Sequence, residues 1–153
     1  MVAAPGFGCM FDVVLIATDG SRSVERAVSV AVDLADRFDA DVHALYVVDT
    51  DEVDASPESV RESYREGLAD RGELAVAAIS ERTGGAATTE VREGRPAPEI
   101  AEYAREVGAD VVALGTRGRH GENRLLLGSV AEAVVRTCPV PVLTVRQLAA
   151  DES

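Results

Sequence analysis

Three glycines and one serine in the last third of the chain could together bind a phosphate group. Gly115, Gly118, Gly128 and Ser129 lie between an apolar run, VVAL, and a run with helical spacing, VAEAVV. Glycines let backbone N–H groups approach a ligand without an intervening Cβ, and the first N–H groups of a helix lack an intrahelical partner. Both features suit an anion, because helix N-termini carry partial positive charge. The residues alone leave a second interpretation open, in which the glycines only form a turn and a helix start.

The rest of the chain alternates between short β-branched runs and longer amphipathic runs. Strands are predicted over residues 12–18, 41–48, 87–92, 111–114 and 140–145, and helices over 24–38, 57–83, 98–107 and 129–136. Ser56 is the expected N-cap of the second helix, which has Pro57 at its first position. Strands alternating with helices of this length indicate right-handed βαβ crossovers and a parallel sheet. We therefore expect a ligand at the carboxyl ends of the strands, where Asp19 and Gly115 both lie.

The composition indicates one domain and excludes several classes of partner. The chain has 153 residues, with 27 acidic residues against 15 basic ones, all arginine, and a net charge of −12. Nucleic acid and anionic lipid are both unsuitable partners, because binding them depends on neutralising phosphates. No segment reaches the roughly 18 apolar residues of a membrane span, and residues 1–9 lack the pattern of a secretory signal. We expect a cytoplasmic protein with an acidic surface like those of proteins adapted to high salt.

Four further segments, each in its expected order along the chain, accompany the glycines and the serine. They are Thr18-Asp19-Gly20-Ser21, Val47-Val48-Asp49, Gly94-Arg95-Pro96 and the closing strand from Pro141 to Val145. With Gly115-x2-Gly118-x9-Gly128-Ser129, this pattern resembles the universal stress protein family over residues 11–146. The resemblance implies a three-layer α/β sandwich with a five-stranded parallel sheet of order 3-2-1-4-5, the Rossmann-like fold of the adenine nucleotide alpha hydrolases. The expected domain spans residues 11–147, between an N-terminal extension, 1–10, and a C-terminal tail, 148–153.

The resemblance also implies a set of nucleotide-binding residues and a ligand, ATP, possibly accompanied by Mg²⁺ or Mn²⁺. The adenine and ribose side would be formed by Ala17, Thr18 and Asp19, with Val47 contacting the base through its backbone. The near wall would be formed by Leu114, Gly115, Arg117 and Gly118, and the phosphates would be held by Gly128, Ser129 and Val130. Asp19 has an alternative role as the N-cap of the first helix. Arg117, Arg119 and Arg124 add positive charge to the same loop, which suits an anionic ligand.

The function expected from these residues is ATP binding by a stress-response or regulatory module. Two alternatives remain: a slow ATPase or phosphotransfer enzyme at the same site, and a nucleotide-free, chaperone-like dimeric module. No catalytic residue and no metal ligand is assigned, because the chain has no lysine for a Walker motif and no evident water-activating carboxylate. His120 lacks a visible catalytic partner, and His43 is interpreted as a packed or edge residue. We expect nucleotide binding rather than efficient turnover.

The last predicted strand, from Val140 to Val145, offers a surface for a second copy of the chain. It is apolar, and little charge protects it from pairing with another strand. Two such strands pairing antiparallel around a twofold axis would cover the edge. Members of the family commonly dimerise in this way, so we expect a homodimer through residues 140–145. A further protein partner that reads the liganded state is expected but not identified by the sequence.

Overall fold

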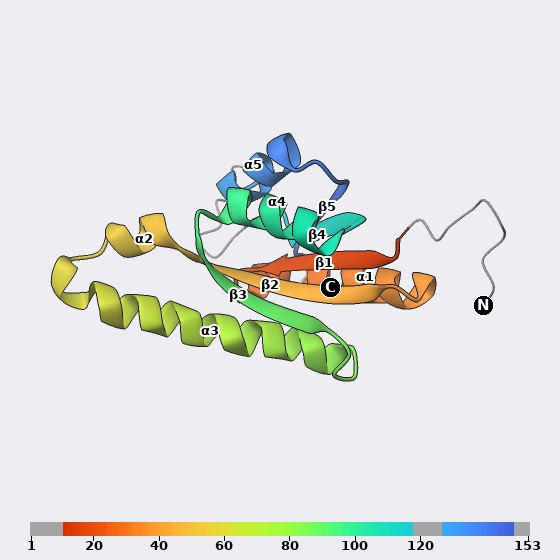
Figure 1. Ribbon diagram of the computed structural model, residues 1–153, viewed down its shortest axis with the longest axis horizontal. Coiled ribbons are helices and arrows are strands. Elements are labelled where there is room, and N and C mark those ends of the chain that lie inside the picture. The colour runs from red at the N-terminus through yellow and green to blue at the C-terminus, as the bar shows by residue number, and fades with distance from the viewer. Residues whose placement is uncertain (1–10, 118–126, 149–153) are drawn as a thin grey trace.

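The computed structural model describes residues 11–117 and 127–148, which form a parallel β-sheet between two layers of helices (Figure 1). The sheet has five strands in the order β3-β2-β1-β4-β5, as the sequence resemblance implied. The strands are β1 Val13–Thr18, β2 Asp41–Asp49, β3 Thr88–Gly94, β4 Val111–Gly115 and β5 Val142–Val145. The helices are α1 Glu25–Phe38, α2 Thr50–Asp54, α3 Arg61–Arg82, α4 Pro96–Val107 and α5 Ser129–Thr137. Along the described residues, no helix is long and apolar enough to cross a membrane.

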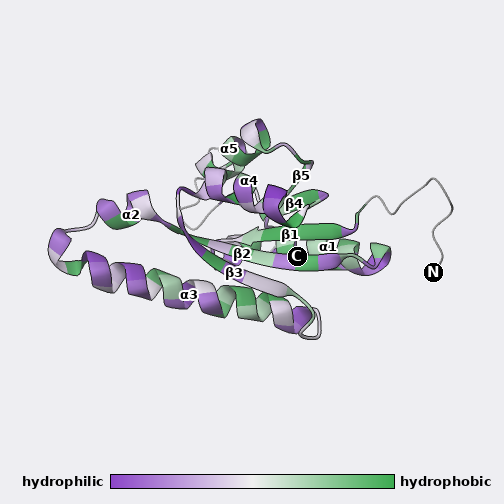
Figure 2. Cartoon of the chain, viewed as in Figure 1, coloured by the Kyte–Doolittle hydropathy of each residue, from purple (hydrophilic) through white to green (hydrophobic). Residues whose placement is uncertain are grey.

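Side chains that alternate along each strand divide the core into two halves, one on each face of the sheet. Val14 and Ile16 of β1 belong to the half that packs against α1 and α3. Leu15 and Ala17 of the same strand belong to the half that packs against α4 and α5. Figure 1 accordingly has α3 on the opposite side of the sheet from α4 and α5. The apolar strands lie between these layers, while α3 carries hydrophilic residues along much of its length (Figure 2).

Helix ends follow the local chemistry of the sequence. α1 ends at Asp39 and α4 ends at Gly108, and both of these residues adopt the left-handed conformation, with φ of 54° and 67°. Such residues stop a helix by directing their N–H groups back to its last carbonyls. Pro96 opens α4, where a missing N–H costs no intrahelical bond. These stops turn the chain back toward the sheet after each helix.

Three local predictions need correction. Ser56 is not the N-cap of the long helix, because a 3-10 turn over Glu58–Val60 precedes α3, and the Ser56 hydroxyl donates to the Glu52 carbonyl at 3.4 Å. The short helix α2 was not predicted; Asp49 caps it by accepting the Asp51 N–H at 3.0 Å. The last strand begins at Val142 rather than residue 140, although the Pro141 carbonyl already accepts the Val112 N–H at 2.9 Å. Proline has no N–H to continue the ladder in the other direction.

Helix α3 packs closely on the sheet because one of its glycines lies against an aromatic ring. Tyr46 of β2 is 2% exposed, and a Cβ built on Gly72 would lie 2.5 Å from the Cδ1 atom of its ring. A second glycine on the same helix, Gly67, has open space where its Cβ would be. The two glycines therefore have different roles, although by sequence alone each is only a residue that weakens a helix.

We predict that Gly72→Ala lowers the free energy of unfolding by about 1–3 kcal/mol, because the new methyl group must displace the Tyr46 ring or the helix. Gly67→Ala, on the same helix, should raise it by up to about 1 kcal/mol, because alanine favours helix and meets no obstacle. Urea denaturation followed by circular dichroism measures both. A Gly72→Ala protein as stable as wild type would show that Tyr46 does not set the spacing between α3 and the sheet.

Candidate functional site

The candidate site lies where the two central strands of the sheet end side by side. β1 and β4 pair in parallel, with Val14 opposite Val111 and Ile16 opposite Ala113. Continuing this register by two residues brings Thr18 beside Gly115. From β1 the chain leads to α1 on one face of the sheet, and from β4 it leads to α5 on the other (Figure 1). Ligands of open parallel α/β sheets bind beyond the strand ends at such a point of divergence, so this edge is the candidate site.

The turn after β1 is held by its own side chains. Thr18 Oγ1 accepts the Gly20 N–H at 3.0 Å, and Asp19 Oδ1 accepts the N–H and the hydroxyl of Ser21 at 2.9 and 2.6 Å. Gly20 has a φ of 76°, a conformation that L side chains rarely adopt. A 3-10 turn, Arg22–Val24, then precedes α1. The alternative role of Asp19 as the N-cap of α1 is therefore wrong, and its carboxylate instead orders the turn at the strand end.

Gly115 has a packing role that the sequence did not reveal. A Cβ at this position would lie 3.0 Å from the carbonyl oxygen of Ser23 and 3.5 Å from the Cα of Val24. The 3-10 turn before α1 therefore lies directly against the backbone at the end of β4. Glycine was predicted here to let a ligand approach the backbone, and the structure adds that it lets the β1–α1 connection approach.

The start of α5 is fixed to the end of β4 by a backbone hydrogen bond. The Gly128 N–H donates to the Thr116 carbonyl at 2.5 Å, and the Glu132 N–H donates to the Gly128 carbonyl at 2.9 Å. Gly128 is the N-cap residue. Among the described residues, no side chain caps the N–H groups of the first turn, which begin with Ser129 and Val130. That these groups bind an anion stays a prediction of the glycine-serine pattern.

Four of the expected site residues share the α4 and α5 side of the sheet. Ala17 and Leu114 are buried, at 7% and 5% exposure, and belong to the core half on that face. Val47 and Val130 are half-buried and pack against the same half. Three of the four lie in the last three residues of their strands, so the structure brings them together at the carboxyl edge. They provide apolar surface next to the polar Asp19 turn and the α5 N-terminus.

Part of the expected site lies outside the described residues, namely Gly118, together with Arg119, His120 and Arg124 from the same loop. Arg117 is described and half-buried, two residues beyond the end of β4. Across residues 11–117 and 127–148, no group of three or more His, Cys, Asp or Glu side chains could hold a metal ion.

His43 is a packed residue, in agreement with the sequence interpretation. Its Nδ1 lies 3.1 Å from the Tyr103 hydroxyl oxygen, and their rings meet edge to face at 5.9 Å between centroids. Burial lowers the pKa of His43, and the charge of Asp41 opposes this with a smaller effect. His43 is the third residue of β2, whose candidate-site end is Asp49. It therefore stands away from the strand ends where a ligand would bind.

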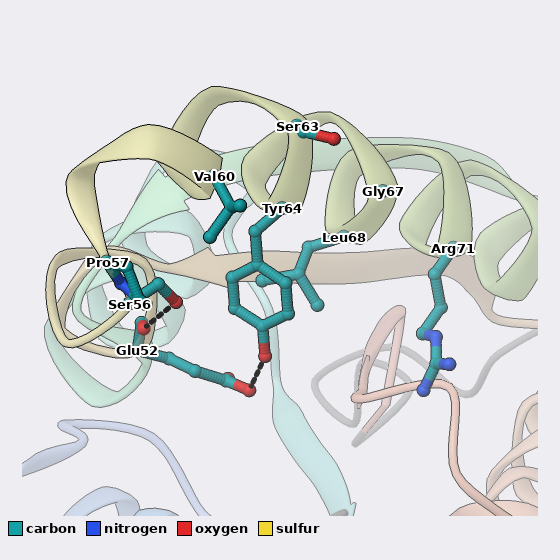
Figure 3. A pocket seen from close by; sticks show the side chains of 9 residues that line it. All are labelled: Glu52, Ser56, Pro57, Val60, Ser63, Tyr64, Gly67, Leu68 and Arg71. Carbon is teal, nitrogen blue, oxygen red and sulfur yellow. Dashed lines mark hydrogen bonds between the residues drawn. The ribbon is translucent and has the colours of Figure 1, made fainter.

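Two features near the site were not predicted. The side chain of Arg71 on α3 reaches the β1 turn, and its Cγ would be 3.3 Å from a Cβ on Gly20. A pocket beside it, between α2 and α3, is lined by residues that include Glu52, Tyr64 and Leu68 (Figure 3). No local sequence pattern could have identified these contacts, because Arg71 and Gly20 are far apart in the chain.

Comparisons with known proteins agree with this architecture. A family model described as the universal stress protein family matches residues 10–146. A universal stress protein of Methanocaldococcus jannaschii is 39% identical over 142 residues, which cover 90% of this chain and 84% of that protein.

Two solved structures share the fold at modest identity. UspA from Lactobacillus plantarum aligns with a TM-score of 0.73 at 27% identity, covering 89% of this chain and 98% of that one. A universal stress protein crystallised in complex with cAMP aligns with a TM-score of 0.55 at 28% identity, covering 90% and 98%. With the family model matching nearly the whole described fold, the chain belongs to the universal stress protein family.

Proposed function

We propose that this protein binds ATP at the carboxyl ends of β1 and β4 and acts as a nucleotide-dependent stress-response or regulatory module. The proposal rests on the backbone geometry at the start of α5. A backbone hydrogen bond joins Gly128 to Thr116 at the end of β4, and within residues 11–117 and 127–148 no side chain caps the first N–H groups of the helix. A phosphate group there would accept hydrogen bonds from the backbone and benefit from the helix dipole.

An adenine nucleotide fits the two kinds of surface beside that helix. The base would lie against the apolar surface of Ala17, Leu114 and Val47, and the Asp19 carboxylate would accept hydrogen bonds from ribose hydroxyls. The cAMP complex of a family member at 28% identity supports an adenine nucleotide as the ligand class.

The phosphates would extend from there to Gly128, Ser129 and Val130, with Gly115, Arg117 and Gly118 on the near wall. A divalent ion, Mg²⁺ or Mn²⁺, would be carried largely by the phosphates, because the described residues offer no three-ligand protein site.

Gly128→Val should weaken ATP binding by at least about tenfold, the equivalent of about 1.4 kcal/mol. The backbone at Gly128 has φ −71° and ψ 169°, which valine adopts without strain, so the fold should persist while the side chain obstructs the phosphates. Isothermal titration calorimetry of the nucleotide-free protein measures the affinity.

The matched control is Val135→Ala, which alters the same helix at a position that is 48% exposed. It should bind ATP as wild type does. If Gly128→Val and Val135→Ala bind ATP equally well, the phosphates do not lie at the start of α5.

A slow ATPase using the same site is the second candidate, because the Ser129 hydroxyl stands at the first position of α5. We predict no phosphate release above the buffer background, since Asp19 Oδ1, at the end of β1, already accepts two hydrogen bonds from Ser21. Steady-state release measured with Mg²⁺ or Mn²⁺ tests this. Turnover that Ser129→Ala abolishes would instead establish the enzyme.

We also propose a homodimer formed through the open edge of β5. Pro141 and Val145 direct their carbonyls toward β4, accepting the N–H groups of Val112 and Thr116. Because backbone groups alternate in direction along a strand, the N–H of Thr144 faces the free edge. An unpaired edge of this kind readily accepts a second strand.

Thr144→Pro should convert the dimer to a monomer, because it removes an outward N–H without removing a bond to β4. Thr144→Val keeps that N–H and should remain dimeric. Sedimentation equilibrium at micromolar concentration in high salt reports the mass of each. A monomeric wild-type protein would contradict the dimer, and a dimeric Thr144→Pro protein would place the interface elsewhere.

A further inference from the structure

The outer edge of β5 offers few backbone groups to a second strand. Pro141 and Val145 direct their carbonyls toward β4. Because backbone groups alternate in direction along a strand, the groups of β5 that face outward belong to Val142 and Thr144, each with an N–H and a carbonyl. A strand that pairs with this edge must bond to the groups of these two residues.

The chain beyond β5 is fixed to the start of α1. Arg26 Nη1 donates to the Arg146 carbonyl at 2.9 Å, and the Arg26 N–H donates to Gln147 Oε1, also at 2.9 Å. The first bond is charge-assisted, and the second gives α1 a capping acceptor that its own N-cap residue, the apolar Val24, cannot supply. By the same alternation, the Arg146 carbonyl would be the next outward acceptor after that of Thr144. Arg26 therefore closes the edge at the carboxyl end of β5.

The edge is also limited at its other end, and it carries no charge. β5 begins at Val142, and residues 139–140 form a bend outside the strand. The side chains of β5 are all uncharged, whereas the opposite edge strand, β3, carries Glu90, Arg92 and Glu93. Charged side chains on an edge strand discourage pairing. The β5 edge is therefore the one suited to a second copy of the chain, over a stretch of only a few residues.

We propose that Arg26, by holding the Arg146 carbonyl, fixes the register of the homodimer so that its twofold axis passes between the two Leu143 residues. This inference rests on the proposed homodimer. Antiparallel pairing centred at Leu143 places Val142 opposite Thr144 of the partner subunit, so that all outward groups of both strands are bonded. Centred instead on Val142 or on Thr144, only that residue would pair within β5, because the next groups lie in the bend or are bonded to Arg26.

The side chains that this register brings together are compatible. Val142 packs on the α5 side of the sheet, and Thr144, two residues on, points to the same side. β-Branched residues opposite each other stabilise a pair of strands. Leu143 packs on the α1 side, where it meets Leu143 of the partner subunit in a non-hydrogen-bonded pair, the closer of the two kinds of pair. The dimer thus gains a side-chain contact on each side of the sheet.

Single cysteines report the register directly. In a Cys9→Ser, Cys138→Ser background, Leu143→Cys should form a covalent dimer under mild oxidation, because the two Cα atoms would lie about 4.5 Å apart, within disulfide reach. Val142→Cys and Thr144→Cys should each cross-link at least about tenfold more slowly, since the paired positions lie diagonally, about 7–8 Å apart. Non-reducing electrophoresis measures the rates. Fastest cross-linking at either of these two positions would overturn the proposed register.

The role of Arg26 is tested by combining Arg26→Ala with Gln147→Ala. Both residues are exposed, so the fold should persist, which circular dichroism checks. The Arg146 carbonyl is then released, and pairing can slide toward Thr144. The ratio of the Thr144→Cys rate to the Leu143→Cys rate should rise at least about tenfold, because one charge-assisted hydrogen bond no longer opposes the slide.

Arg37→Ala is the matched control, because Arg37 lies in the last turn of the same helix and is paired with Asp33 at 2.9 Å. It removes the same charge and should leave the ratio of rates as in wild type. Equal ratios for Arg37→Ala and the Arg26→Ala, Gln147→Ala protein would overturn the role of Arg26 alone. A wild-type protein that sediments as a monomer would overturn the proposed homodimer, and this inference with it.

Discussion

The parallel pairing of β1 with β4 is the constraint on which the rest of the structure depends. These two strands occupy the middle of the sheet, and the chain leaves them toward opposite faces. The hydrogen bond from the Gly128 N–H to the Thr116 carbonyl then fixes the start of α5 beside the end of β4. Without that register, the Asp19 turn and the α5 N-terminus would not both lie at the carboxyl ends of the central strands.

Two glycines of this protein allow close packing of helices and turns on the sheet. Gly72 accommodates the buried Tyr46 ring, and Gly115 accommodates the backbone of Ser23. At Gly72 the helix backbone lies directly against an aromatic ring of the sheet, and at Gly115 the turn before α1 lies directly against the strand. Both positions leave no room for a larger side chain, as expected of a close-packed interior.

The fold could be predicted because burial of one face of each element spaces the apolar residues regularly along the sequence. The apolar runs of the strands and the stripes of α1 and α4 identified most elements, and the family resemblance supplied the strand order. α2 was missed because five residues are too few to show a helical period, although Asp49 followed by Asp51 and Glu52 is a helix-start signal. The inserted 3-10 turn at Arg22–Val24 separated Asp19 from α1, which no propensity rule anticipates.

The candidate site was predictable where its residues adjoin strand ends, and hidden where they come from a distant helix. Ala17 and Leu114 lie near the ends of β1 and β4 and Gly128 lies at the start of α5, while their contact with a nucleotide stays a prediction. The approach of Arg71 to Gly20 depends on how α3 crosses the sheet. Gly118 lies outside the described residues and stays a prediction.

The most direct test of the account is the backbone amide spectrum of ¹⁵N-labelled protein during titration with ATP. We predict that the largest shifts fall on Gly128, Ser129 and Val130, with smaller ones at Asp19 and Gly115. Shifts confined to other parts of the sheet, with the amides at the start of α5 unchanged, would contradict the claim that this helix binds the phosphates.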